Sequence, residues 1–394
     1  MRPDHQYAEQ LGHPAGWLLR CSDTARRPTP STAAELQPPE DREDFHWFNF
    51  YRFSVSWPRV LPKGDLSVIN QDGLDYYNNL INELVNNDTF LYIMHLTKTG
   101  DQFTMYHWDL PQHLQDLGGF ANDIIIDYFE DYANLLFTHY GDRVKWWIKF
   151  NELLSFVNGY SSTKFAPAVN APGVGLYLVG HNVLKAHARV YHLYDDHFRS
   201  QQRGKVSITL NMDYPMPKNN SEADINATEI YLQFKLGWFA HPIYSSEGDY
   251  PAVMKERVAN NSRAEGLPRS RLPEFGEHWV KYIRGTHDFY GMNLYTANLI
   301  SVSNTTADVT DSSNSDMGSI IAEQDPSWPY EGLNDFREIP DCLEILPVGK
   351  DNCALRPLYP TMKIQNGNSF RYTTGSKSCK IQRAGDGEVR GASI

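Results

Sequence analysis

The feature that most constrains the fold of this chain is a regular alternation of strand-like and helix-like segments, from Phe45 to about Pro329. Strand-like segments alternate polar and apolar side chains or form short apolar runs, whereas helix-like segments repeat apolar residues three and four positions apart. The predicted strands cover residues 51–57, 103–107, 144–150, 206–210 and 288–293. The predicted helices carry the stripes Leu74, Tyr77, Ile81 and Leu84; Ile125, Phe129, Tyr132 and Leu136; and Val179, Val183, Ala186, Val190 and Leu193, with two further stretches at 231–236 and 274–283. Repeated units with polar residues after each strand favour a parallel (β/α)8 TIM-type barrel over an open doubly wound sheet.

The most informative junction is the end of the apolar run Val144–Phe150, which is followed directly by Asn151 and Glu152. A strand this apolar is expected to be covered on both faces, and barrel enzymes place their chemistry at the C-terminal ends of such strands. A second interpretation is structural: Asn151 caps the following helix and Glu152 lies in its first turn. Position alone leaves both interpretations open.

The other predicted strand ends supply further polar and aromatic residues, so that the candidate set is Arg52, His107, Trp108, Asn151, Glu152, Asn211, Asn293 and Tyr295. Hydrogen-bonding groups and aromatic surface around one acid suit the hydroxyls and faces of a sugar. Glu152 could protonate a glycosidic oxygen if burial or a neighbouring negative charge raised its pKa.

Charge and composition exclude several classes of partner. The formal net charge of −12 lacks the basic footprint that nucleic acid or an anionic membrane requires. No glycine-rich phosphate loop follows a strand, which excludes a dinucleotide cofactor, and Cys21, Cys342, Cys353 and Cys379 form no metal-ligand spacing. We therefore expect no cofactor and no metal; a Cys342–Cys353 disulfide and two free thiols both remain possible.

The two ends of the chain differ from its middle. Residues 1–44 lack periodicity and are predicted to be disordered, residues 45–330 to form the barrel, and residues 331–394 to be divergent and largely irregular. The N-terminal residues lack the continuous apolar core of a signal peptide, and no transmembrane run occurs.

Several ordered segments together resemble glycoside hydrolase family 1, the β-glucosidase and myrosinase family. These segments are Tyr51–Arg59, Tyr106–Gln112, Phe150–Glu152, Leu236–Pro242, Asp288–Tyr295 and Asp325–Pro329. The resemblance implies a (β/α)8 barrel, a retaining mechanism and a small β-glucoside or oligosaccharide as substrate. Together with sequons at Asn87, Asn219, Asn226, Asn260 and Asn304, it also implies a secreted or lumenal glycoprotein.

The resemblance also assigns roles to individual residues. It makes Glu152 the general acid and base, and it makes His107 and Asn151 ligands of the sugar, with Asn151 holding the 2-hydroxyl. Arg52 and Tyr295 match residues that orient and ionise the nucleophile. Trp108 and Asn293 complete the predicted substrate-binding set.

Two departures from the family concern the first half of the barrel. Before Phe45 the residues match neither the first strand nor the first helix of the family, so the first unit is predicted to be missing. The third strand can be placed twice, at Phe90–Leu96 or at Phe103–His107, with Thr97–Gln102 between the two.

A third departure concerns the nucleophile. A retaining glycosidase needs a second carboxylate about 5 Å from the first, which this family carries in a Thr-Glu-Asn-Gly motif. The nearest segment after Tyr295 is Lys363–Gly367, which would place the amide of Gln365 there; whether Gln365 occupies that position is left open. The last unit of the barrel is likewise not recognisable.

Three hypotheses follow from the sequence. The first is a retaining β-glucosidase impaired by loss of the nucleophile. The second is an inactive relative that binds a glycan or a protein partner. The third is a non-functional partial gene product, for which unpaired strand edges and exposed apolar helix faces predict aggregation.

Overall fold

The computed structural model describes residues 52–86, 102–302 and 312–325, together with short strands between residues 342 and 382. Five parallel strands follow one another in chain order across a single sheet. They are β1 (Arg52–Ser54), β2 (Gln102–Tyr106), β3 (Trp146–Asn151), β4 (Lys205–Pro217) and β5 (Tyr290–Val302). Consecutive parallel strands joined by helices are the repeating unit of a (β/α)8 barrel. The predicted α/β architecture is confirmed.

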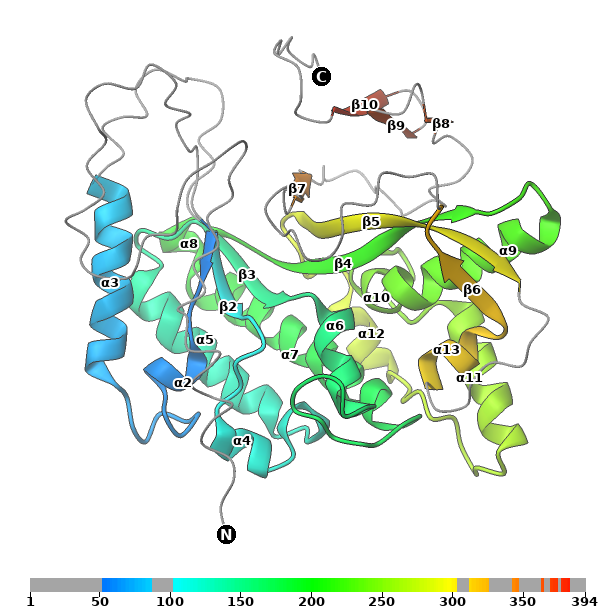
Figure 1. Ribbon diagram of the computed structural model, residues 1–394. Coiled ribbons are helices and arrows are strands. Elements are labelled where there is room, and N and C mark those ends of the chain that lie inside the picture. The colour runs from blue at the N-terminus through cyan, green and yellow to red at the C-terminus, as the bar shows by residue number, and fades with distance from the viewer. Residues whose placement is uncertain are drawn as a thin grey trace.

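The helices gather along the sheet, and Figure 1 shows α5, α7, α10 and α12 on the same side of it. Their bounds are α2 Trp57–Val60, α3 Gln71–Asn86, α4 Gln112–Asp116, α5 Ile125–Tyr140, α6 Leu153–Val157, α7 Gly175–His197, α8 Arg199–Gln202, α9 Glu222–Leu232, α10 Trp238–Tyr244, α11 Ala252–Ala264, α12 Glu277–Ile283 and α13 Ser312–Met317. Shorter turns are the 3₁₀ helices Gly119–Ala121 (η3) and Asn158–Tyr160 (η4) and the π-helix Gln233–Gly237 (η5). None of the helices in this described part is long and apolar enough to cross a membrane.

The helical stripes predicted from the sequence lie where the pattern placed them. Ile125, Phe129, Tyr132 and Leu136 of α5 are all buried, as are Val179, Val183, Ala186 and Val190 of α7. Burial of such a stripe against the sheet is what a surface helix of a globular protein requires. The periodicity therefore predicted both the existence of these helices and the faces they bury.

Several strand boundaries differ from the predictions. The first strand ends at Ser54, because Trp57 begins the short helix α2, in which Pro58 occupies an early position that tolerates proline. β4 and β5 run on to Pro217 and Val302, so Asn211, Asn293 and Tyr295 lie within strands and not at strand ends. Of the two segments predicted for the third strand of the family, the one that begins at Phe103 forms β2, because β2 pairs with both β1 and β3.

The last strands are antiparallel. β6 (Ile320–Glu323) and β7 (Cys342–Leu346) both pair with β5, and β8 (Lys363–Ile364), β9 (Ser369–Thr374) and β10 (Lys377–Gln382) form a small separate sheet. The assignment of residues 331–394 as largely irregular stays a prediction. Outside the described residues lie 1–44, Phe90–Leu96, Gln365, Cys21, Cys353 and the sequons at Asn87 and Asn304.

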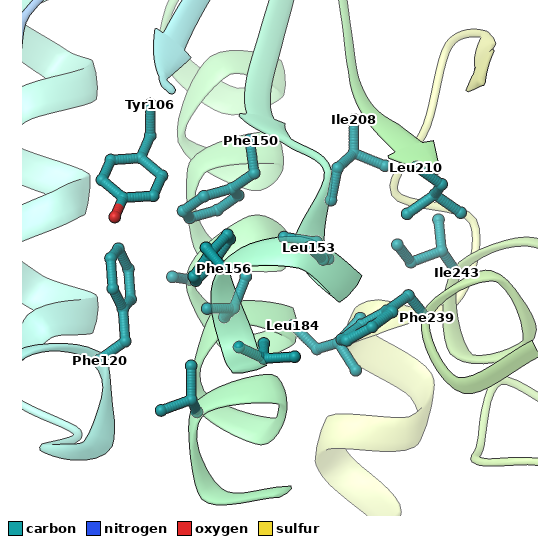
Figure 2. Close-up of a cluster of buried hydrophobic side chains, with 14 of the residues drawn as sticks. Tyr106, Phe120, Phe150, Leu153, Phe156, Leu184, Ile208, Leu210, Phe239 and Ile243 are labelled. Atoms are coloured by element: carbon teal, nitrogen blue, oxygen red, sulfur yellow. The ribbon is translucent and has the colours of Figure 1, made fainter. Parts of the chain in front are cut away.

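Part of the hydrophobic core surrounds Phe150 and Leu153, the two residues that flank the Asn151–Glu152 junction (Figure 2). Leu153 and Phe156 of the short helix α6 pack there with Phe150, and the ring centroids of Phe120 and Phe156 are 5.4 Å apart. Leu184 of α7 is drawn in the same cluster. Because α6 begins immediately after Glu152, burial of its apolar residues fixes the position from which the Glu152 side chain projects.

Candidate active site

The backbone turns sharply at Glu152. This residue has φ 55° and ψ 67°, a left-handed conformation that few non-glycine residues adopt. Its amide donates to the carbonyl of Thr209 on β4, at 2.9 Å, which holds the turn against the neighbouring strand. The structural capping interpretation is wrong, because Glu152 stands at the N-cap of α6 without a side-chain capping bond and Asn151 is still part of β3. Strained backbone of this kind is concentrated at functional sites.

Asn151 is the centre of a hydrogen-bonded group, and only 1% of its surface is exposed. Its Oδ1 accepts from Arg52 Nη2 at 2.6 Å and from Asn293 Nδ2 at 3.3 Å. Its Nδ2 lies 3.1 Å from Nε2 of His107. One side chain thus connects β1, the end of β2 and β5. We call Arg52, His107, Asn151, Glu152 and Asn293 the strand-end cluster, after the end of β3 at its centre; Arg52 itself begins β1, and Asn293 lies inside β5.

The protonation state of His107 follows from its surroundings. Burial, with a smaller contribution from the positive charge of Arg52, lowers the pKa of His107 to about 4. The ring is therefore neutral at physiological pH, and Nε2 accepts the hydrogen bond from the amide of Asn151. The remaining ring nitrogen, Nδ1, then carries the proton.

Donors converge on the carboxylate of Glu152, which is 3% exposed. Asn293 Nδ2 donates to Oε1 at 2.6 Å, and the Tyr295 hydroxyl donates to the same oxygen. Ser155 Oγ lies 3.4 Å from Oε2. A buried carboxyl held on both oxygens keeps a fixed direction, which proton transfer to one defined atom requires.

Trp108 forms the exposed edge of the site. Its indole Nε1 donates to the carbonyl of Asn151 at 2.9 Å, while 45% of its surface remains exposed. Like Glu152, it has a positive φ, 71°. The next residue, Asp109, is half-buried, and its partial burial raises its pKa to about 6 despite a hydrogen bond from Ser56. The loop after β2 is thereby tied to the end of β1 while the aromatic face of Trp108 stays open.

Two further residues, Thr104 and Ser155, support the site but were not among the candidates predicted from the sequence. Thr104 accepts from Arg52 Nε at 3.2 Å, and Ser155 accepts from Asn211 Nδ2 at 3.0 Å. Thr104 is a polar residue inside an apolar strand, and Ser155 follows Glu152 by three positions, where a helix turn brings it back. Both signals were present in the sequence but are weak on their own.

The predicted site residues are therefore brought together with one gap. Arg52 contacts Asn151, and Tyr295 contacts Glu152. Their predicted roles toward a nucleophile stay predictions, since Gln365 lies outside the described residues. In the part of the chain that the structure covers, no three His, Cys, Asp or Glu side chains are arranged to hold a metal ion.

A second polar group occupies the same strand, two residues before Asn151. Lys149 is fully buried, and its Nζ makes no hydrogen bond among the described residues. The Nζ lies 5.0 Å from the centroid of the Tyr191 ring on α7. Burial lowers the pKa of Lys149 well below its usual value, with Asp288 opposing and Arg199 reinforcing the shift.

These features first define a class of protein: a (β/α)-barrel with a buried carboxyl group among amide, imidazole and aromatic side chains. The sequence profile of Glycosyl hydrolase family 1 matches residues 45–361, and the chain belongs to this family.

Named relatives agree with this assignment. Myrosinase 1 of Brevicoryne brassicae is 46% identical over 320 residues, which are 81% of this chain and 63% of that protein. The human Cytosolic beta-glucosidase is 44% identical over 253 residues, covering 64% of this chain and 51% of that protein. Among solved structures, Aphid myrosinase matches with a TM-score of 0.65 and 45% identity over 72% of this chain and 58% of that chain. The chain thus spans less than two thirds of the length of these relatives.

Proposed function

We propose that this chain is a retaining-type glycosidase of β-glucosides in which Glu152 is the general acid and base. One observation carries the proposal: the buried Glu152 carboxyl is held by Asn293, Tyr295 and Ser155 at the end of β3. Protonation of the leaving oxygen is the step for which an acid fixed in this way is suited.

The neighbouring residues suit recognition of the sugar. Asn151 and the neutral His107 present hydrogen-bonding groups beside the acid, and the exposed ring of Trp108 offers a face for the C–H surface of a pyranose. Amide and imidazole groups of this kind fit the hydroxyls of an uncharged glucoside better than a charged substrate. Names of relatives such as Cytosolic beta-glucosidase support the same substrate class.

A carboxylate nucleophile is not recognisable in the sequence. No acid after Tyr295 stands in a Thr-Glu-Asn-Gly context, and the nearest segment carries Gln365. An amide cannot form the glycosyl ester of a retaining mechanism. We therefore propose that turnover is impaired at this position while the acid and the sugar contacts remain. The same observation favours the second candidate function, glycan binding without turnover.

Azide tests this proposal on the full chain with an aryl β-glucoside. If the nucleophile is absent, azide attacks the anomeric carbon from the α face as the bond to the aryl oxygen breaks. Glu152 gives its proton to that oxygen and recovers one from water. The expected product is α-glucosyl azide, formed only when azide is added and strongly reduced in Glu152→Gln.

The alternatives give different results in the same experiment. Retaining hydrolysis without azide would show that a carboxylate nucleophile is present, and the proposed impairment would be wrong. Saturable binding of the glucoside with no product, in folded protein, would support the binding function and reject the glycosidase.

Compartment and partners remain proposals. We infer a secreted or lumenal location from the sequons. Asn219, Asn226 and Asn260, the sequon asparagines of the described part, are all exposed. Relatives that include a cytosolic enzyme do not favour either compartment. Glycosidase digestion of protein expressed in a secretory host would show whether these asparagines carry glycans.

A further inference from the structure

The N-terminal half of α7 carries two stripes of different character. Its apolar stripe packs into the core, as described above. A second stripe, Leu178, His181, Asn182 and Lys185, repeats with the same helical spacing but is mostly polar. Together with the segment from Gly118 to Asp123, before α5, it lines a cavity of about 480 Å³. Side chains that line a cavity are accessible to a ligand, unlike the side chains of the apolar stripe, which pack in the core.

Two buried side chains of this stripe keep a polar atom available. The ring of His181 stacks on Phe275, with centroids 4.3 Å apart, and its Nδ1 lies 3.1 Å from the hydroxyl of Tyr250. Asn182 Nδ2 donates to the carbonyl of Phe120 at 2.9 Å. Within the described residues, neither His181 Nε2 nor Asn182 Oδ1 has a hydrogen-bond partner. Internal contacts therefore fix the two side chains and leave one hydrogen-bonding atom of each for a ligand.

The rim of the cavity carries one charge of each sign. Lys185 Nζ lies 5.1 Å from the centroid of the Trp279 ring and forms no ion pair in the described part of the chain. Asp123 lines the same cavity, and its negative charge opposes the lowering of the Lys185 pKa by burial. Burial and the nearby Lys185 lower the pKa of His181 to about 3, so the imidazole adds no charge at physiological pH. The lining thus combines polar and apolar surface, and its two charges have opposite signs.

One positive and one negative side chain in the same lining favour an uncharged ligand. An anion would meet Asp123 and a cation would meet Lys185, whereas hydroxyl groups can donate to the carboxylate and accept from the ammonium. Leu178 and Ala121 supply an apolar surface for the C–H groups of the same ligand. A volume of about 480 Å³ is within the range of small-molecule sites.

We propose that this cavity on α7 is a second, non-catalytic binding site for a neutral sugar of one or two rings. It shares no lining residue with the strand-end cluster around Glu152. The Phe120 ring packs instead into the aromatic cluster behind that site, 5.0 Å from the Tyr106 ring (Figure 2). The proposal does not depend on turnover by Glu152.

The test is a titration of the full chain with methyl β-D-glucoside, followed by NMR of ¹³C-labelled alanine and leucine methyl groups. We expect saturable shifts of the Ala121 and Leu178 methyl signals. Lys185→Met removes the ammonium but keeps the stem, and it should weaken this binding about threefold to tenfold, the effect of one lost hydrogen bond. Asp123→Ala should weaken it to a similar extent.

Lys205→Met is the matched control, because Lys205 Nζ also lies over a tryptophan, 4.5 Å from the Trp146 centroid, but does not line the cavity. It should leave the titration unchanged. The proposal is overturned if neither methyl signal shifts at glucoside concentrations far above millimolar, or if inorganic phosphate shifts them more strongly. It is also overturned if Asn151→Ala, in protein shown to be folded, abolishes the shifts, since they would then originate at the strand-end cluster.

Discussion

Two buried polar residues of β3, Lys149 and Asn151, lie only two positions apart and differ in their hydrogen bonding. Asn151 uses both ends of its amide, with partners on Arg52, His107 and Asn293. Lys149 is equally buried, yet its amine makes no hydrogen bond among the described residues. Burying a polar group is costly unless its hydrogen bonds are replaced. Burial alone therefore does not identify the functional part of this strand. The functional residue is the one whose side chain is hydrogen-bonded to residues of neighbouring strands.

A second lysine makes the comparison sharper. Lys145, just before β3, donates from Nζ to the carbonyls of Asp142 and Gln202 at 2.7 and 2.8 Å. These carbonyls lie just after α5 and at the end of α8, where a cation is favourable. The same residue type is therefore expected to stabilise the fold at one position and destabilise it at the other.

The largest effect is expected for Asn151→Ala. The substitution removes the acceptor of Arg52 Nη2, the donor to His107 and one of the two acceptors of Asn293 Nδ2, and the free energy of unfolding should fall by about 3 kcal/mol. Urea denaturation followed by tryptophan fluorescence measures this. Asn211→Ala is the control, because only one side-chain hydrogen bond of Asn211 is made within the described residues, to Ser155. Equal losses in the two variants would contradict the central role of Asn151.

Lys149→Met should stabilise the protein by about 2 kcal/mol, because an apolar side chain of similar length removes the buried amine without leaving a partner unpaired. Lys145→Met should instead destabilise it by about 1 kcal/mol through the lost carbonyl contacts. Thermal unfolding of both variants beside the parent chain gives the two signs. Stabilisation by both substitutions, or by neither, would contradict the expected difference between Lys149 and Lys145.

Acid should destabilise the fold over a defined window. Burial lowers the pKa values of His107 and His287 to about 4 from 6.5, so the unfolded chain binds more protons than the folded chain between these values. Stability is complete above pH 6.5 and is lost as the pH falls toward 4, by about 1 kcal/mol per histidine between pH 6.5 and 5.5. Urea denaturation across this range measures the slope. In His107→Asn the slope should be shallower by one histidine; an unchanged slope would show that His107 titrates normally.

The smallest effect is expected for Ser155→Ala, which removes the weak contact to Glu152 and the acceptor of Asn211. The loss of stability should be about 1 kcal/mol. Ser155→Thr keeps the hydroxyl and should restore most of it. If the threonine variant is as unstable as the alanine variant, packing in α6 and not the hydroxyl determines the effect.

Two kinds of sequence pattern predicted parts of the strand-end cluster. Apolar periodicity placed α5 and α7 and their buried faces, and the polar pair after Phe150 identified the end of β3. The partners of Asn151 could not be derived from periodicity, because Arg52 and Asn293 are separated from it by 99 and 142 residues. Their contacts depend on strand order, which the family resemblance supplied.

Other features were beyond the sequence for identifiable reasons. β4 and β5 extend past Asn211 and Asn293 because they continue to pair with each other, as in Met216 with Leu299. Such pairing depends on the neighbouring strand and leaves no local signal. Lys149 reads as one polar residue in a strand, and nothing nearby in the sequence indicates that its amine lies over Tyr191.

The most direct measurement of the central claim, that Glu152 protonates the leaving oxygen, compares two leaving groups. With azide present in every assay, kcat/KM is measured for 4-nitrophenyl and 2,4-dinitrophenyl β-glucosides in the parent chain and in Glu152→Gln. The dinitrophenolate leaves without a proton, so the variant should lose at least about 100-fold with the first substrate and much less with the second. An equal loss with both substrates, in folded protein, would contradict the assignment of Glu152 as the acid.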